Sequence, residues 1–309
     1  HLMRGMILLV LALGTGALAQ APVSTGTPLP GSGIPGGLFA LKEMDMHLHA
    51  GMERPVPLNE WVALAAADGR KVIVLLDHLE LYRKAPEEYA AWRAEKGFEV
   101  EYPLGTAGHA ALMQGFDEVA AAHPELIFFK GWEVSETELD EGSEPDALRR
   151  ADVIGWHISP ANGRKAPDGA HLIKRARQVL EIQREYPVPM ILFHPFSMRL
   201  ENIQRTAERE GRDKSTLTVE DYRFFQPGEQ EALAALLRGS SVYIEISNAN
   251  ERYIQDPVCR EALIADIRPL AEMGVQFTVS TDNHGLRSAQ TPFQPEVYCE
   301  PLGITPAHT

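Results

Sequence analysis

Cysteine is scarce in this sequence, and acidic residues outnumber basic ones. The 309 residues include two cysteines, Cys259 and Cys299, too few for a disulfide scaffold or a four-cysteine zinc site. There are 29 lysines and arginines against 43 acidic residues, which gives a formal net charge of −14. Proteins that bind nucleic acid need basic patches facing the phosphates, so this balance argues against nucleic acid as a partner. It also argues against docking on an anionic membrane surface.

The apolar run near the start of the chain is too short to cross a bilayer. It covers Met6–Leu13, whereas a spanning helix needs roughly 20 apolar residues. Arg4 precedes the run and Ala17–Ala19 follows it, which is the pattern of a secretory signal peptide and its cleavage site. We therefore predict a signal peptide over residues 1–19, with a short N-terminal remnant, and export to the periplasm or the medium. No stable membrane association is expected after cleavage; an ordinary buried helix is the alternative.

The next segment has the composition of a linker. Residues 21–37 are rich in Pro, Gly, Ser and Thr and carry no charge. Such a composition cannot pack a core, so we predict a flexible linker over residues 20–40 and a folded domain over residues 41–309. Export would permit a disulfide between Cys259 and Cys299, and two unpaired buried thiols are the alternative.

Beyond the linker, short apolar runs alternate with longer amphipathic segments. Runs rich in Val, Ile, Leu and Phe predict seven strands, near 44–48, 71–76, 126–130, 151–156, 189–193, 241–246 and 275–280. Their continuous apolar character indicates burial on both faces, as in a parallel sheet. Helices are predicted over 58–68, 86–96, 107–122, 170–186, 229–237 and 257–273. The alternation predicts a single α/β domain closed into a TIM-like barrel, with residues 197–226 as a polar lid or loop over its mouth.

Every predicted strand carries an ionisable residue in or just past its C-terminal end. Asp45, His47 and His49 alternate along the first strand and so share one face. The others, in chain order, are Asp77, His78, Glu133, His157, His194, Glu245, Asp282 and His284. In a parallel barrel these ends form one rim, where active sites lie. One histidine there would have an ordinary structural explanation, but six of the 11 favour a shared metal site for zinc, manganese or iron.

Taken together, these motifs resemble the polymerase and histidinol phosphatase (PHP) family of metal hydrolases. The resemblance covers residues 44–284 and rests on DMHLH at 45–49, DH at 77–78, GWEVS at 131–135, VIGWHIS at 153–159, FHP at 193–195, EISN at 245–248 and STDNH at 280–284. It implies a distorted (β/α)7 barrel, two or three divalent metal ions, and hydrolysis of phosphate esters.

The resemblance also implies which residues bind the metals. The expected ligands are His47, His49 and Asp282 for the first ion, His157 and His194 for the second, and His78 and His284 for the third, with Glu133 bridging the first two. The family usually supplies one further ligand of the third ion, at the position of Arg54 or Pro55. Glu53 is the nearest carboxylate and is the expected substitute, so the third ion is expected to bind more weakly.

The expected chemistry is attack on a small phosphate ester. A hydroxide held between two divalent ions is a strong nucleophile near neutral pH, and the ions stabilise the charge that develops on the phosphoryl group. Asp45 and Asp77 are expected to orient imidazoles through the ring nitrogen that does not bind metal. Arg199, close to His194 in sequence, is the candidate anchor for the substrate phosphate. The expected partner is therefore a small-molecule substrate.

Two other functions remain open at this point. An amidohydrolase-like enzyme acting on phosphotriesters, lactones or amides also begins with an HxH pair, but it normally has eight strands and often a modified lysine between its metals. Lys130 is the lysine nearest to a suitable strand end. A non-catalytic exported protein that binds metal for buffering or sensing is the second alternative.

Overall fold

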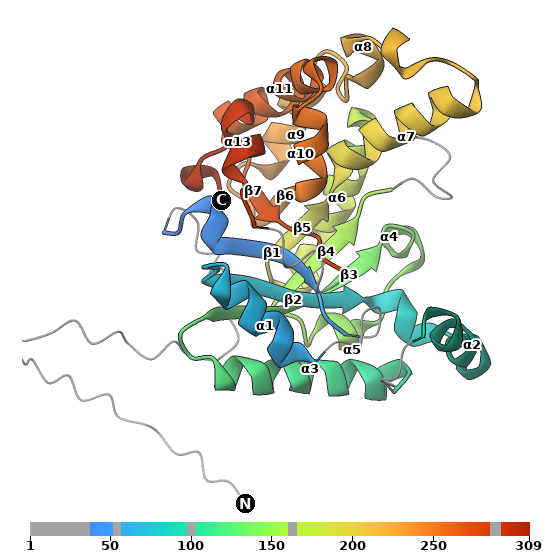
Figure 1. Ribbon diagram of the computed structural model, residues 1–309, viewed down its shortest axis with the longest axis vertical. Helices are drawn as coiled ribbons and strands as arrows, with labels where there is room; N and C mark the ends of the chain where they lie inside the picture. Colours follow the sequence, from blue (N-terminus) through green and yellow to red (C-terminus); the bar gives the residue numbers. More distant parts are fainter. Residues whose placement is uncertain (1–37, 52–56, 98–102, 160–165, 285–291) are drawn as a thin grey trace, which may run out of the picture.

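The computed structural model of the chain describes residues 38–51, 57–97, 103–159, 166–284 and 292–309 (Figure 1). The predicted signal peptide, most of the predicted linker, and Glu53 lie outside these residues, so those expectations stay predictions.

Seven parallel strands form one sheet in chain order (Figure 1). They are β1 (Met44–His49), β2 (Val72–His78), β3 (Ile127–Ser135), β4 (Val153–His157), β5 (Met190–Phe193), β6 (Val242–Ser247) and β7 (Phe277–Ser280). Each strand pairs with its neighbour in parallel register. The strands are mostly buried because the sheet curls into a nearly closed barrel with helices outside it. The predicted single-domain α/β barrel of seven strands is confirmed.

The barrel closes between its first and last strands by a short seam. Leu48 and Asn283, just beyond β7, form an isolated parallel bridge. Two backbone hydrogen bonds accompany it: the N–H of His49 donates to the carbonyl of Asn283 at 3.1 Å, and the N–H of Asp282 donates to the carbonyl of His47 at 3.0 Å. The seam therefore joins the HxH pair directly to the chain that carries Asp282.

The predicted helices lie between the strands they were expected to connect. These are α1 (Leu58–Ala67), α2 (Pro86–Lys96), α3 (Gly105–Ala122), α6 (Gly169–Glu185), α9 (Glu229–Leu237) and α11 (Pro257–Glu272). Shorter pieces are η1 (Leu41–Glu43), η2 (Leu79–Arg83), α4 (Glu138–Glu141), α5 (Pro145–Leu148), η5 (Asn248–Asn250), α10 (Glu251–Ile254), α13 (Glu296–Leu302) and η6 (Pro306–His308). The aliphatic and aromatic side chains between the helices and the sheet form one continuous core.

The polar segment at 197–226 is more regular than expected. It begins within α7 (Pro195–Arg209) and continues through η4 (Lys214–Thr216) and α8 (Val219–Tyr222). Leu200, Tyr222 and Phe224 are buried, and α8 packs against α7 and α11. The polar composition of the segment concealed these buried apolar residues. Because they pack against neighbouring helices, the segment belongs to the helical layer rather than to an irregular loop.

One aromatic side chain fills the barrel beneath the HxH pair. Phe193, the last residue of β5, stacks on the imidazole of His47 with 3.8 Å between ring centroids. The ring lies over Gly155 of β4, where an added Cβ would be 1.7 Å from Cε2 of Phe193. The absence of a side chain at Gly155 therefore leaves room for the ring of Phe193.

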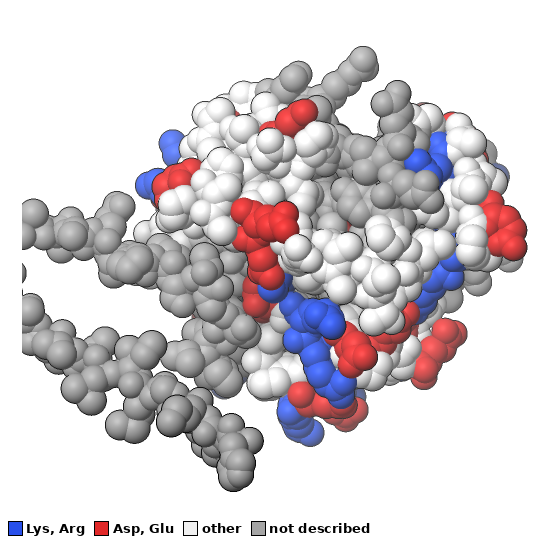
Figure 2. Space-filling view, turned by 90° about the horizontal axis from the view of Figure 1, so that it is seen from below, with Lys and Arg blue, Asp and Glu red and all other residues white. Residues whose placement is uncertain are grey.

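Acidic and basic side chains lie side by side on the face shown in Figure 2. Among the described residues, ion pairs such as Lys84–Glu88 and Lys130–Asp117 join side chains of opposite charge. Among the described residues, no helix combines the length and the apolar character needed to span a membrane. Cys259 and Cys299 are both buried free thiols.

Candidate metal centre

Four side chains from two strands and the turn after β7 converge inside the barrel. His47 and His49 alternate along β1, and their Nε2 atoms lie 2.9 Å apart. Oε2 of Glu133, on β3, is 3.2 Å from the first of these nitrogens and 3.1 Å from the second. Oδ1 of Asp282 is 3.5 Å from each of them. All four donor atoms thus face a common point.

The spacing of these atoms fits a metal ion. A tetrahedral ion with donors at about 2.1 Å holds those donors about 3.4 Å apart, close to the separations of 2.9–3.5 Å found here. Oδ1 of Asp282 is also buried without a hydrogen-bond partner in the described structure. A buried carboxylate oxygen without a hydrogen bond is costly, and a divalent cation would satisfy it.

The other oxygen of Glu133 faces a second group. Oε1 lies 2.8 Å from Nδ1 of His157 and 3.4 Å from Nε2 of His194. These three donors lie within 4.8 Å of one another. The Glu133 carboxylate therefore has one oxygen toward each group, which is the arrangement of a carboxylate that bridges two neighbouring ions.

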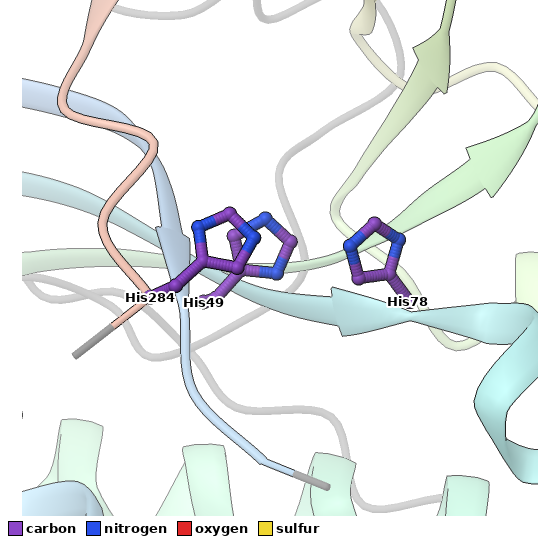
Figure 3. A group of neighbouring side chains, drawn as sticks. All are labelled: His49, His78 and His284. Carbon is purple, nitrogen blue, oxygen red and sulfur yellow. The ribbon is translucent and has the colours of Figure 1, made fainter. Parts of the chain in front are cut away.

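A third group consists of His49, His78 and His284 (Figure 3). The ring of His49 stacks on that of His284 at 3.8 Å and on that of His78 at 4.6 Å. His49 belongs to both the first and the third group. The predicted substitute ligand Glu53 lies outside the described residues, so its part in the third group stays a prediction.

Hydrogen bonds to Nδ1 of two imidazoles indicate that Nε2 is the nitrogen each ring would offer to a metal ion. Nδ1 of His47 lies 2.7 Å from Oε1 of Glu245, and Nδ1 of His284 lies 2.8 Å from the carbonyl oxygen of Asp282. Each acceptor requires a proton on Nδ1, so Nε2 of each ring is the nitrogen that would bind a metal ion. This is the tautomer that binds metal through Nε2.

The charges of the site stabilise one another. Burial would lower the pKa of His47, but the carboxylates of Glu245, Asp282 and Glu133 raise it well above its usual range. Burial disfavours the ionised form of Glu133, but the charges of His78 and His47 outweigh this and hold its pKa well below its usual range. The Glu133 carboxylate is therefore ionised, and without metal His47 carries a second ring proton that a divalent cation would displace.

Two residues of the site have strained backbones. His194 and Asp282 have φ angles of +38° and +53°, and they are the two residues other than glycine in the described chain with positive φ. Such conformations cost on the order of 1–3 kcal/mol and persist where surrounding bonds enforce them. The N–H of His194 donates to Oε2 of Glu245, and that of Asp282 donates to the carbonyl of His47. The strain directs both side chains into the cluster.

Within the described part of the chain, Asp45 bonds to the seam and not to an imidazole, contrary to expectation. Its Oδ1 accepts a bond from the N–H of Thr281 at 2.9 Å, and its Oδ2 accepts one from the Thr281 hydroxyl at 2.7 Å. The guanidinium of buried Arg70 lies 3.3 Å from the same carboxylate. Strand alternation places Asp45 on the same face of β1 as His47 and His49, but two residues before His47 and so further from the rim. At that level its carboxylate contacts Thr281 at the seam rather than an imidazole ring.

Asp77 bonds to its own strand end and to the following turn. Its Oδ1 accepts from the N–H of His78 at 2.9 Å, and its Oδ2 accepts from the hydroxyl of Tyr82 at 2.8 Å. Oδ2 also lies 2.4 Å from where a Cβ on Gly51 would be, so the chain after the HxH pair passes close to this carboxylate. Asp77 thereby fixes the backbone around His78.

Arg199 binds backbone carbonyls in the helical layer. Its Nε donates to the carbonyl of Tyr222 at 3.1 Å, and its Nη1 donates to that of Pro167 at 3.0 Å. The guanidinium also lies over the ring of Phe224 at 5.8 Å. These contacts attach α7 to neighbouring segments and occupy the side chain that was expected to anchor phosphate.

Replacing Arg199 with methionine should therefore lower stability rather than activity. Two carbonyls would lose their donor, which corresponds to a free energy of unfolding reduced by about 1–3 kcal/mol. Thermal melting and turnover of an aryl phosphate per folded molecule are the measurements. An unchanged melting temperature with a more than tenfold loss of turnover would restore the expected role in substrate binding.

Glu245 is a member of the site to which the sequence assigned no role. It lies within apolar β6 and is 1% exposed, and its carboxylate contacts His47, His194 and Ser280. The available signal was a carboxylate in an otherwise apolar strand, which is costly unless it has partners. The identity of those partners depends on contacts between distant strands.

No protein-family model and no curated protein matches the chain. Among solved structures, the chain is similar to a histidinol phosphate phosphatase from Lactococcus lactis in complex with zinc, L-histidinol and phosphate. The two sequences are 13% identical, the alignment covers 81% of this chain and 90% of that chain, and the TM-score is 0.46. The chain is also similar to a xylose isomerase domain protein from Alicyclobacillus acidocaldarius, with 16% identity, 84% and 98% covered, and a TM-score of 0.35. At these values the similarities carry no argument about activity, which rests on the side chains of the site.

Proposed function

We propose that this protein is a metal-dependent hydrolase of small phosphate esters. The observation that carries the proposal is the Glu133 carboxylate, whose two oxygens face two separate groups of donors. His47, His49 and Asp282 would hold one ion, and His157 and His194 the other. Zinc, manganese and iron suit such imidazole and carboxylate donors. When bound, a pair of divalent ions supplies an activated water and stabilises charge on a phosphoryl group.

The chain's own residues prepare the site for this chemistry. Glu245 and the carbonyl of Asp282 accept from Nδ1 of His47 and of His284, which leaves Nε2 as the nitrogen that each ring would offer to a metal ion. Phe193 and the buried strands close the barrel beneath the cluster, so water and substrate would reach it from the rim. His157 and Asp282 are the partly exposed members of the two groups, with 33% and 26% of their side chains accessible, which leaves an open side toward that rim.

The amidohydrolase alternative fits the geometry less well. Nζ of Lys130 donates to Asp117 of α3 at 2.6 Å, in the outer layer of the fold. Lys130 lies three residues before Glu133 on β3, an odd separation that places the two side chains on opposite faces of the strand. A modified Lys130 on that face could not bridge the two groups, which supports Glu133 as the proposed bridge.

Removal of metal from the purified protein provides the test. We expect the protein to contain divalent metal by elemental analysis and to hydrolyse one or more phosphate esters in a panel of mono-, di- and triesters, lactones and amides. Dialysis against a chelator should abolish this activity, and added Zn²⁺ or Mn²⁺ should restore it. Hydrolysis confined to lactones or amides would support the amidohydrolase alternative. A fully loaded protein that hydrolyses no member of the panel would indicate the non-catalytic alternative. Export is also a proposal, tested by whether cells cleave the chain after residue 19.

A further inference from the structure

The carboxylate of Glu245 accepts hydrogen bonds from three other segments of the barrel. Oε1 lies 2.7 Å from Nδ1 of His47 on β1 and accepts the hydroxyl proton of Ser280 at the end of β7. Oε2 accepts the backbone N–H of His194, just after β5, at 2.8 Å. All of these groups are buried.

Two of these bonds act on different donor groups. The bond to His47 fixes the ring tautomer and orientation of a member of the first group. The bond to His194 holds the backbone of a member of the second group at a φ of +38°, a conformation disfavoured for a side-chain-bearing residue. One carboxylate therefore sets the geometry of one ring in each group.

We infer that Glu245 is a positioning residue that couples the two metal sites, so that its removal weakens both together. This inference rests on the proposed metal centre. Glu245 lies close enough to His47 and His194 to be considered a third metal ligand with them. Both of its oxygens, however, already accept N–H or O–H protons, and a cation among these groups would have to displace them. Nε2 of His47, directed away from Glu245, is the atom that faces the first group.

The substitution Glu245→Gln tests this coupling with little change in size. A carboxamide has one accepting oxygen, so it cannot accept both from His47 Nδ1–H and from His194 N–H at opposite ends. The control is Ser280→Ala, which removes the third donor to the same carboxylate without touching either imidazole. His157→Ala serves as a reference that alters the second group alone.

Metal-free samples of each variant are titrated with Zn²⁺ against a chelating indicator, and their thermal melting is recorded without metal. In Glu245→Gln we expect both affinities to fall by about 10- to 100-fold, the usual effect of losing a residue that supports a ligand. Ser280→Ala should keep both affinities even if its melting temperature falls, and His157→Ala should lose one. If Glu245→Gln does not fold, Glu245→Asp, which retracts the charge by one methylene, is titrated in the same way and should show the same double loss.

The outcomes separate this inference from the proposed function. Two unchanged affinities, or the loss of one alone, in a folded Glu245 variant would overturn the coupling and leave the metal centre standing. Equal losses of Zn²⁺ affinity in the Glu245 variant and in Ser280→Ala would overturn the coupling, because Glu245 would then have only a general structural role. An unsubstituted protein that takes up no Zn²⁺ would overturn the metal centre itself.

Discussion

Replacing Glu133 with glutamine should reduce phosphate-ester hydrolysis by about 10³-fold or more, equivalent to ~4 kcal/mol of transition-state stabilisation. The carboxamide replaces one accepting oxygen by an NH₂ group, which has no lone pair for a cation and would point its protons at one of the two donor groups. It also removes the negative charge between the groups. Because both groups share this carboxylate, we expect bound metal to fall along with turnover.

The same substitution three residues later provides the control. Glu136 is also buried, but it faces outward and contacts His171 and Arg175 of α6. Glu136→Gln should lower the melting temperature and keep both the metal content and the activity of the folded protein. Elemental analysis, turnover and thermal melting of the two variants are compared side by side. A Glu133→Gln protein with full metal content and normal turnover would remove the basis for the proposed function.

Adding one methyl group at Gly155 should be among the most destabilising small changes in this barrel. A Cβ there would lie 1.7 Å from Cε2, 2.2 Å from Cζ and 2.5 Å from Cδ2 of Phe193, whose ring is fully buried. The ring would have to move, and it stacks on His47. Overpacking of this kind costs about 3 kcal/mol, and the displaced ring would also disturb the first donor group.

Gly115→Ala is the matched control. Gly115 lies in the interior of α3, where an added Cβ would meet the flexible end of Leu58 at 3.1 Å. Alanine in a helix interior is favoured over glycine by about 0.5–1 kcal/mol, so this variant should be as stable as the original or slightly more so. Chemical denaturation gives both free energies of unfolding. A Gly155→Ala protein of unchanged stability would mean that the ring of Phe193 does not occupy the position described.

Much of the fold could be predicted because its signals are local. The apolar runs of a buried parallel strand and the amphipathic stretches between them are readable in one window of sequence, and α9 begins and ends where predicted. The third strand continues past its predicted end at residue 130 to Ser135. The prediction stopped early because Gly131 and Glu133 are residue types that are uncommon in strands. The helix α7 was not predicted because most of its residues are polar and conceal the few apolar residues that it buries.

The members of the donor groups were predictable, but their supporting contacts were not. Alternation along β1 was enough to expect His47 and His49 side by side. It also suggested that Asp45 would support a ring, a role that the geometry gives to Glu245, 198 residues away from His47 along the chain. Which carboxylate reaches which nitrogen depends on the stagger of strands around the barrel, and no local pattern encodes that stagger.

The seam between β1 and β7 would make loading of the proposed metal centre a late event in the synthesis of each molecule. Asp45 and Thr281, which bond across it, are 236 residues apart. At synthesis rates of about 5–20 residues per second, the HxH pair leaves the ribosome on the order of ten seconds or more before Asp282 does. An ion captured in that interval would have only part of its donor set. The completed chain would therefore have to dock its last strand before the proposed centre could hold metal firmly, and nascent or truncated chains should be isolated without metal.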